Sequence, residues 1–188
     1  MNISINQSIP DMSFDVFHEE KFSKKSFSDF DGKWLVVMFY PADFSYVCPT
    51  ELKEAQGRYE EIKKMGAEII SVSCDSTYVH KAWHDSSPAI KQITYPMAAD
   101  PSGALARAFG IYVEEKGESL RGTFIINPKG VLMAMDIHNT DIGRSISEII
   151  RKLTAFQYVA KHHNEVCPAG WTTGDKTIKK SVDLIGKI

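Results

Sequence analysis

Two of the three cysteines in this chain lie in the same tripeptide, once as Val47-Cys48-Pro49 and again as Val166-Cys167-Pro168. Cys48 follows an apolar run and a proline-containing turn, whereas Cys167 follows a long helical pattern near the C-terminus. A thiolate can attack a small oxidant and become a sulfenic acid, which a second thiol converts into a disulfide. The two settings therefore indicate different tasks: Cys48 is placed to attack an oxidant, and Cys167 is free to reach a sulfenic acid formed elsewhere.

Cys48 occupies the expected start of a helix. Pro49 suits a first helical turn, where a missing N–H costs nothing, and Glu51 is an acid at the favourable end of the helix dipole. Unpaired N–H groups at such a terminus favour a thiolate, the only nucleophilic form of cysteine. The alternative is that Cys48 is a small buried hydrophobic residue behind an aromatic strand. Position alone leaves both interpretations open.

No Cys-x-x-Cys motif occurs, because Glu51 stands three residues after Cys48. Dithiol exchange within one motif is therefore excluded, which argues against an ordinary thiol-disulfide oxidoreductase, the first rival function. A lone thiolate would instead react with an oxidant and wait for a distant thiol.

Strands and helices alternate along the chain, as the hydrophobic periodicity shows. The expected strands are 3–9, 34–40, 67–73, 95–99, 123–127 and 131–137, and the expected helices are 49–66, 77–84, 101–109 and 146–160. Residues 12–30 are interpreted as apolar positions beside polar, turn-like segments. This order predicts an α/β sandwich with a mixed sheet, in which parallel crossovers precede an antiparallel pair. The first strand–helix unit is thioredoxin-like in outline.

Bulk composition narrows the class of partner. The chain has 188 residues and a net charge of −2. Its hydrophobic fraction of 43% is close to that of ordinary globular domains. This charge gives no reason to expect nucleic acid or an anionic membrane as a partner. The longest apolar run, Trp34–Tyr40, is far too short to cross a bilayer, and no signal peptide is recognisable. Three sparse cysteines favour a cytoplasmic protein over a secreted disulfide scaffold.

The spacing Pro41-x-x-x-Ser45-x-x-Cys48 resembles the signature of the peroxiredoxins. The resemblance extends over essentially the whole chain and is greatest to the typical 2-Cys class and, within it, to the bacterial alkyl hydroperoxide reductase group. It rests on the stretches 39–52, 80–84, 121–128, 157–160 and 184–188. It implies a peroxiredoxin-type, thioredoxin-like three-layer sandwich with a mixed central sheet and a C-terminal tail.

The resemblance also implies roles for the residues around Cys48. As the peroxidatic cysteine, Cys48 would attack a peroxide oxygen, and Ser45 and Arg121 would donate hydrogen bonds to the reacting oxygens. Pro41 would shield the thiolate, and Glu51 would orient Arg121 through a bidentate pair. Taken singly, each of these residues other than Cys48 has a plainer interpretation. Pro41 would be a turn former and Ser45 a loop hydroxyl, while Arg121 would be a surface cation and Glu51 a first-turn acid. Ser45 stands where the family more often has threonine.

Cys167 resembles the resolving cysteine of this family. The resemblance implies an intersubunit disulfide with Cys48 in a head-to-tail homodimer, commonly assembled as five dimers. The corresponding domains would be 1–163, the peroxidase domain, and 164–188, the tail. No cofactor is expected in the chain, since no dinucleotide fingerprint occurs. NADH or NADPH would act through a partner reductase, either a disulfide-reducing flavoprotein or a thioredoxin.

Other chemistry-bearing residues are interpreted structurally. Cys74 ends a buried strand pattern and is expected to be an inert core thiol. His80 and His84 are four residues apart, but no metal is expected there.

A ring-shaped holdase chaperone remains the second rival function. The preferred hydroperoxide, the reductant and the oligomer size are left open by the sequence.

Overall fold

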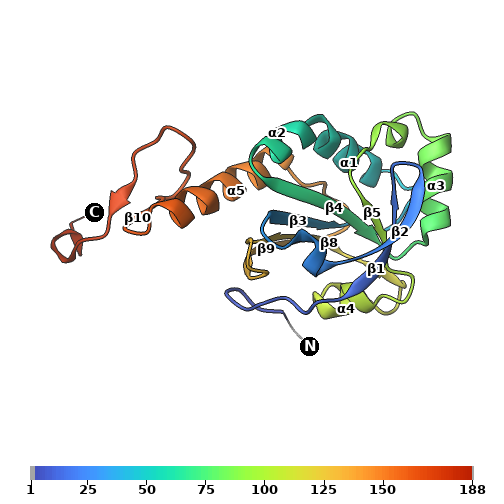
Figure 1. Cartoon of the computed structure of the whole chain (residues 1–188), viewed down its shortest axis with the longest axis horizontal. Coiled ribbons are helices and arrows are strands. Elements are labelled where there is room, and N and C mark those ends of the chain that lie inside the picture. Colours follow the sequence, from blue (N-terminus) through green and yellow to red (C-terminus); the bar gives the residue numbers. More distant parts are fainter. Residues whose placement is uncertain (1–2, 188) are drawn as a thin grey trace. The chain divides into compact units, whose positions relative to one another are not determined.

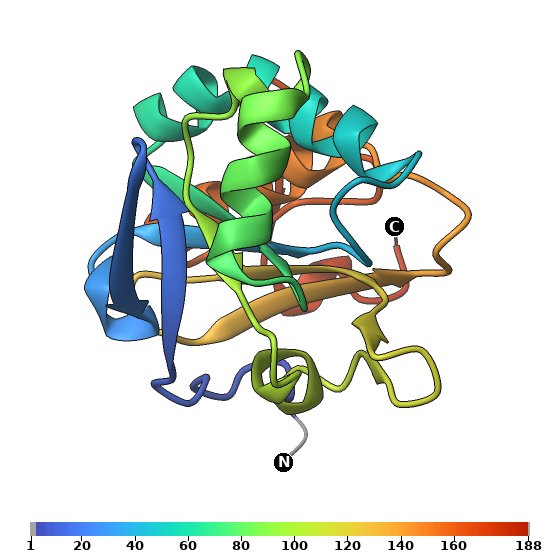
Figure 2. The same cartoon turned by 90° about the vertical axis from the view of Figure 1, so that its right-hand side faces the viewer.

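The computed structural model describes residues 3–187 and divides the chain into two compact units, one ending at Arg144 and one beginning at Ser145. The first unit contains a seven-stranded mixed sheet (Figures 1 and 2). In spatial order its strands are β2 (Lys21–Ser26), β1 (Ser13–His18), β5 (Met97–Ala99), β4 (Ala67–Ser73), β3 (Trp34–Phe39), β8 (Arg121–Ile126) and β9 (Leu132–His138). The expected fold class, a thioredoxin-like α/β sandwich with a mixed sheet, is confirmed.

Helices cover both faces of this sheet, which gives three layers. α1, α2 and α3 lie on one face and α4 on the other (Figures 1 and 2). The helical elements of this unit are η1 (Phe27–Phe30), α1 (Cys48–Gly57), α2 (Tyr59–Lys64), α3 (Thr77–Ser86), η2 (Ile90–Gln92) and α4 (Ala104–Ala108). A small separate hairpin joins β6 (Tyr112–Val113) to β7 (Glu118–Ser119).

β3 is a central strand of the sheet and leads into the loop that carries the first thiol. All six of its residues are buried, as expected for an uninterrupted apolar run covered on both faces. It pairs parallel with β4 and antiparallel with β8. The carboxyl ends of β3 and β4 and the first residue of β8 therefore lie at one edge of the sheet.

The N-terminal expectations were wrong. Residues 3–9 form a turn with Asn6 at φ 66° and a single bridge from Ser8 to Val131, not a strand. The segment interpreted as turn-like contains the β1–β2 hairpin. Its turn uses Glu19 and Glu20 at positive φ, positions where glycine or asparagine would have signalled a hairpin. β2 is an exposed edge strand, so it lacks the alternating apolar pattern.

The helices agree with expectation more closely. The helix expected over 49–66 is present but divided, because the chain leaves helical geometry at Arg58 (φ −111°, ψ 4°) directly after Gly57. The helix expected over 101–109 shortens to α4, which begins after Gly103 in the left-handed conformation.

The second unit consists of α5 (Ile146–Lys161), the antiparallel pair β10 (Glu165–Val166) and β11 (Ile178–Lys179), and η3 (Val182–Leu184). Trp171 is buried and packs its ring 5.1 Å from that of Tyr158, so the C-terminal region has internal structure of its own. The predicted division into 1–163 and 164–188 concerns function and stays a prediction. Within residues 3–187, no helix has the length and apolarity that a membrane crossing requires.

Candidate active site

Cys48 is the first residue of α1 and is fully buried. The helix starts without a side-chain cap: the N–H groups of Thr50 and Glu51 both donate to the carbonyl of Val47. Pro49 contributes no N–H in this turn, as expected of proline at a helix start. The sulfur therefore lies at the positive end of a helix dipole, in agreement with the expectation from the position of Pro49.

Arg121 reaches this sulfur from the edge of the sheet. It is the first residue of β8, and its Nη1 donates to Cys48 Sγ at 3.3 Å. Its Nε and Nη2 both donate to the carbonyl of Thr140, at 2.9 and 2.7 Å, which fixes the plane of the guanidinium. Arg121 is buried, so its alternative interpretation as a surface cation is wrong.

A second buried arginine, Arg144, joins the group through Glu51. Its Nε donates to Glu51 Oε1 at 2.8 Å and its Nη2 donates to Oε2 at 2.9 Å, while its backbone N–H donates to Oε1 as well. Nη1 of Arg144 donates to the carbonyl of Gly122 and the hydroxyl of Thr123 on β8. Glu51 also accepts one bond from Arg121 Nη1, at 2.7 Å.

The expected bidentate pair between Glu51 and Arg121 is therefore wrong. Arg121 uses a single nitrogen for Glu51, and the fork-to-carboxylate pair belongs to Arg144. The sequence pattern did not single out Arg144, which stands in a loop after β9 and is one of many basic residues. No local signal in the sequence marks Arg144 as the partner of Glu51, which lies 93 residues away.

The charges of this group do not balance unless the sulfur is ionised. Arg121 and Arg144 carry two positive charges, Glu51 carries one negative charge, and all three are at most 6% exposed. Burial strongly penalises an uncompensated charge. A thiolate formed on Cys48 would supply the second negative charge, and Arg121 Nη1 already contacts the sulfur at 3.3 Å.

The carboxyl of Glu51 is held ionised within this group. Burial alone would raise its pKa, but the hydrogen bonds and charge of Arg144, followed by the charge of Arg121, lower the pKa below its ordinary value of 4.5. Glu51 therefore stays a carboxylate through the neutral range.

The loop before α1 carries Pro41 and Ser45. Pro41 is buried, and Ser45 is half-buried with its hydroxyl donating to the carbonyl of Ala42 at 2.7 Å. No hydrogen bond joins Ser45 to Cys48 among the described residues, so Ser45 would have to turn its hydroxyl away from Ala42 to donate to a reacting oxygen. The structure thus brings Cys48, Arg121 and Glu51 into direct contact and places Ser45 on the adjoining loop.

Cys167 lies in the second unit, directly after β10, and is half-buried. It borders a cavity of about 450 Å³ between α5 and the residues after β10, together with Arg151, Phe156 and Pro168. Partial burial raises the pKa of the Cys167 thiol; the charge of Arg151 opposes this rise and that of Glu165 adds to it. Cys167 is thus mostly protonated at neutral pH, in contrast to the cation-rich setting of Cys48.

The remaining cysteine and the buried histidine His80 have structural settings. Cys74 is half-buried beyond the end of β4, and burial, then Asp100 and Asp75, raise its pKa to about 12, which makes it a poor nucleophile. It packs against the core from its edge rather than lying within it, which corrects the expectation of a core thiol. His80 is hydrogen-bonded to Asp43 and to the carbonyl of Ala98.

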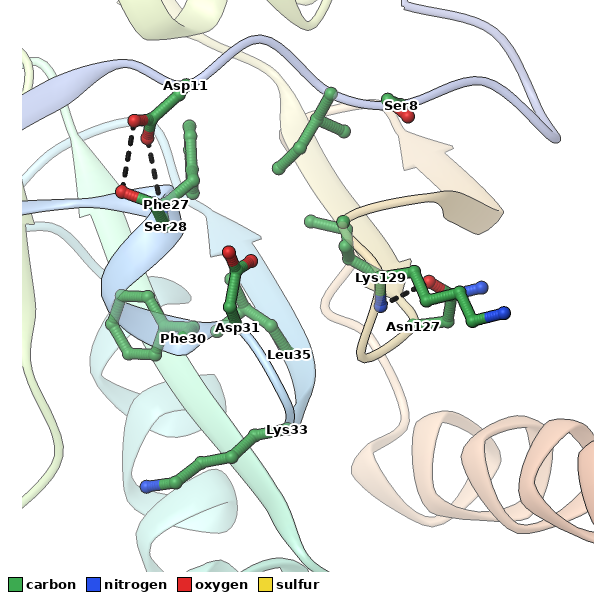
Figure 3. Close-up of a pocket in the computed structure, with 13 residues that line it drawn as sticks. Ser8, Asp11, Phe27, Ser28, Phe30, Asp31, Lys33, Leu35, Asn127 and Lys129 are labelled. Carbon is green, nitrogen blue, oxygen red and sulfur yellow. Dashed lines mark hydrogen bonds between the residues drawn. The ribbon is translucent and has the colours of Figure 1, made fainter.

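A separate cavity of about 180 Å³ lies between η1, the N-terminal segment and the turn at Asn127–Gly130 (Figure 3). There the carboxylate of Asp11 accepts hydrogen bonds from the backbone N–H and the hydroxyl of Ser28. None of the residues that line it is a cysteine, a histidine or an arginine. It contributes no group to the chemistry around Cys48.

Comparison with known proteins finds matches over nearly the whole chain. The AhpC/TSA family matches residues 5–135, and the C-terminal domain of 1-Cys peroxiredoxin matches residues 155–188. The chain is 44% identical to alkyl hydroperoxide reductase C of Pseudomonas aeruginosa, with 98% of each chain covered. It is 52% identical to alkyl hydroperoxide reductase C of Amphibacillus xylanus, with 86% of each covered.

Solved structures show the same fold. The crystal structure of AhpC from Enterococcus faecalis is 47% identical, with a TM-score of 0.86 over 89% of this chain and 100% of that one. The reduced 2-Cys peroxiredoxin of Plasmodium vivax is 27% identical, with a TM-score of 0.91 over 95% of this chain and 94% of that one.

Proposed function

The chain belongs to the AhpC/TSA family and is a peroxiredoxin, an oxidoreductase that acts on hydroperoxides, and we propose that Cys48 is the thiol that attacks the peroxide. The observation that carries this proposal is the 3.3 Å contact between Arg121 Nη1 and Cys48 Sγ in a buried group with one positive charge in excess. The charges of Arg107 and Arg151 act on Cys74 and Cys167, but burial outweighs them and raises the pKa of both thiols.

The proposed step is a displacement at oxygen. The Cys48 thiolate attacks the terminal oxygen of a hydroperoxide, an S–O bond forms and the O–O bond breaks. The departing oxygen takes a proton and leaves as water or an alcohol, and the sulfur becomes a sulfenic acid. Negative charge moves from sulfur to the departing oxygen, so a donor that serves both atoms stabilises the transition state. Arg121 is placed to be that donor, while Pro41 and Ser45 close the site on the loop side.

Resolution by Cys167 is the second part of the proposal. Cys48 is 0% exposed, so its sulfur cannot meet another thiol until the first turn of α1 opens. Cys167 would then attack the sulfenic sulfur, forming an S–S bond and releasing water. The structure described as a 2-Cys peroxiredoxin supports a reaction with two cysteines. We assign the bond to two subunits of a homodimer, which would assemble further as five dimers.

The disulfide must be reduced by a partner. A disulfide-reducing flavoprotein that draws on NADH or NADPH, or a thioredoxin, fits a peroxidase whose chemistry uses thiols alone. The cytoplasm, where such partners keep thiols reduced, is the proposed compartment.

The function is tested by peroxide consumption with each candidate reductant. The wild type should turn over hydrogen peroxide and small organic hydroperoxides, while Cys48→Ser should be inactive. Cys167→Ser should reduce one equivalent of peroxide and then stop, unless a small thiol replaces the missing partner. Continued turnover by Cys48→Ser would contradict the role assigned to Cys48.

The pairing is tested on a non-reducing gel after one equivalent of peroxide. The wild type should shift from 21.1 kDa to about twice that mass, because the bond joins two chains. Cys167→Ser should stay at monomer mass, and Cys74→Ser serves as the control that shifts like the wild type. An oxidised wild type that remains at monomer mass would place the bond within one chain.

Ser45 provides a test of the loop side. Ser45→Val removes the hydroxyl and has the size of the matched variant Ser45→Thr, and it should slow the second-order reaction of Cys48 with hydrogen peroxide by about 10²-fold, as for other oxyanion donors. Ser45→Thr keeps the hydroxyl and should react like the wild type. Unchanged peroxide reactivity in Ser45→Val would remove Ser45 from the mechanism.

A further inference from the structure

A buried chain of hydrogen bonds connects the loop before Cys48 to α3 and β5. The hydroxyl of Tyr40 donates to Asp43 Oδ1 at 2.7 Å, and His80 Nδ1 lies 2.8 Å from Asp43 Oδ2. His80 Nε2 lies 3.1 Å from the carbonyl oxygen of Ala98. The side chains of Asp43 and His80 are both 0% exposed, so water does not compete for these bonds.

The partners determine how protons are placed. The carbonyl of Ala98 can only accept, so His80 Nε2 carries a hydrogen. Nδ1 and Asp43 Oδ2 must then share a second proton, because two lone pairs do not face each other at this distance. Asp43 and His80 are thus either an ion pair or a neutral pair, with no net charge in either form. Burial, and then the charge of Asp43, raise the pKa of Tyr40, which keeps its hydroxyl a donor.

The backbone of Asp43 is held from another direction. Its N–H donates to Asp75 Oδ2 at 2.9 Å, and the hydroxyl of Ser73, the last residue of β4, donates to the same oxygen at 2.8 Å. Asp43 is therefore attached to α3 through its carboxylate and to the end of β4 through its amide.

The next residue adopts a conformation that needs such support. Phe44 has φ 53°, in the left-handed region that is unfavourable for a residue with a Cβ. The residue is 60% exposed and its ring lies 5.9 Å from that of Trp83, so its own packing offers little compensation. Residues in such conformations persist where their surroundings over-determine them. The turn that Phe44 makes brings the hydroxyl of Ser45 back to the carbonyl of Ala42.

We propose that Asp43 and His80 are positioning residues for peroxide reduction: their buried pair holds the strained turn that keeps Pro41 and Ser45 over Cys48. This inference rests on the proposed role of Cys48 as the attacking thiol. The pair touches neither the sulfur nor the substrate, so it acts through the loop. Its loss should slow attack on peroxide, which needs the closed loop. It should not slow formation of the disulfide, for which the first turn of α1 must open in any case.

The decisive variant is the double substitution Asp43→Ala/His80→Leu, which removes both members of the pair, so that neither is left buried without the other, although the Tyr40 hydroxyl and the Ala98 carbonyl lose these partners. We expect the second-order rate constant for Cys48 oxidation by hydrogen peroxide to fall by about 10²-fold, as for a small misplacement of catalytic groups. The rate of disulfide formation should stay the same or rise. Both rates are read from stopped-flow fluorescence of the reduced full chain, with Cys167→Ser isolating the first step.

Two single variants keep the test independent of whether the double variant folds. Asp43→Asn should react like the wild type, because the amide can accept from Tyr40 and donate to His80 Nδ1. Asp43→Ala should react as slowly as the double variant, because the effects of substituting two residues that contact each other are not additive. The matched control is Lys81→Leu/Asp85→Ala, an exposed ion pair at 2.7 Å on the same helix, which should leave both rates unchanged.

The outcomes separate the positioning role from the peroxidase mechanism itself. If the wild type reacts and Asp43→Ala reacts equally fast, the positioning role is overturned while the peroxidase mechanism stands. If Cys48 oxidation and disulfide formation slow by the same factor, the positioning role is also overturned, since equal slowing indicates general destabilisation of the fold. If peroxide leaves Cys48 unmodified in the wild type by mass spectrometry, the proposed function fails, and the positioning role with it.

Discussion

Arg121→Met should slow the reaction of Cys48 with hydrogen peroxide by about 10³-fold, at the upper end of what one oxyanion donor contributes. Methionine has a similar length and no charge, so it removes the 3.3 Å contact with Sγ and the bond to Glu51 together. Two losses add: fewer molecules hold a thiolate, and the departing oxygen loses a donor. The second-order rate constant follows from competition with a reference peroxidase, and the ultraviolet absorbance of the thiolate is read in parallel.

Arg107→Met is the matched control for this substitution. Arg107 is 45% exposed at its side chain and pairs with Glu114 on the surface, so its loss should leave the rate unchanged. Arg121→Lys should fall between wild type and Arg121→Met, because an ammonium keeps the charge but cannot maintain the planar contacts with Thr140. If Arg121→Met reacts as fast as Arg107→Met, then Arg121 has no part in peroxide attack.

Glu51→Gln should lower the free energy of unfolding by about 3–5 kcal/mol, the usual effect of removing one member of a buried ion group. The substitution leaves Arg121 and Arg144 buried with no carboxylate between them, although the size of the side chain is unchanged. For a chain of 188 residues this corresponds to a fall in Tm on the order of 10 °C. Urea unfolding followed by circular dichroism measures it.

The matched control for Glu51→Gln is Glu60→Gln. Glu60 pairs with Lys63 on the surface of α2, with a side chain 72% exposed, so its loss should change stability by less than about 1 kcal/mol. Equal effects of the two substitutions would contradict the view that the buried group is held together by Glu51.

The same carboxylate predicts a pH dependence. The pKa of Glu51 is lower in the folded chain than its ordinary value of 4.5, so the folded state binds this proton more weakly than the unfolded state. Its stabilising contribution is complete above pH 4.5 and is lost as the pH falls through the folded pKa. The loss of wild-type stability on acidification should therefore be steeper than that of Glu51→Gln, as urea unfolding at a series of pH values would measure.

Local patterns were sufficient for the elements that carry the thiols. Pro49 and the apolar repeat behind it placed a helix start at Cys48, and the uninterrupted run ending at Tyr40 predicted a fully buried strand. Such signals are local because they depend on hydrogen bonding between nearby backbone groups and on which side chains within one short segment are apolar enough to be buried. The β1–β2 hairpin escaped prediction for the same reason, since its turn residues Glu19 and Glu20 are atypical and β2 is exposed.

Of the two arginines in the site, one was predictable from the sequence and the other was not. Arg121 was singled out because its segment resembles a known family, and the antiparallel pairing of β8 with β3 explains how it reaches the sulfur. Arg144 carries no local sign of burial, because nothing in its neighbours reveals that Glu51, 93 residues away in the chain, is its partner. The same holds for His80 and Asp43, whose spacing of 37 residues has no helical or strand period.

By itself, the sequence placed one thiol at a helix start, a second thiol far along the chain, and no Cys-x-x-Cys motif. The class of chemistry followed from the resemblance of Pro41-x-x-x-Ser45-x-x-Cys48 to a known family, because position alone did not distinguish a reactive thiol from a buried one. Only the tertiary structure decided how that thiol is charged and held, through the contact of Arg121 with sulfur, the fork of Arg144 on Glu51 and the buried pair of Asp43 and His80. These are contacts between residues far apart in the chain, and their energies depend on burial, which exists only once the layers have packed.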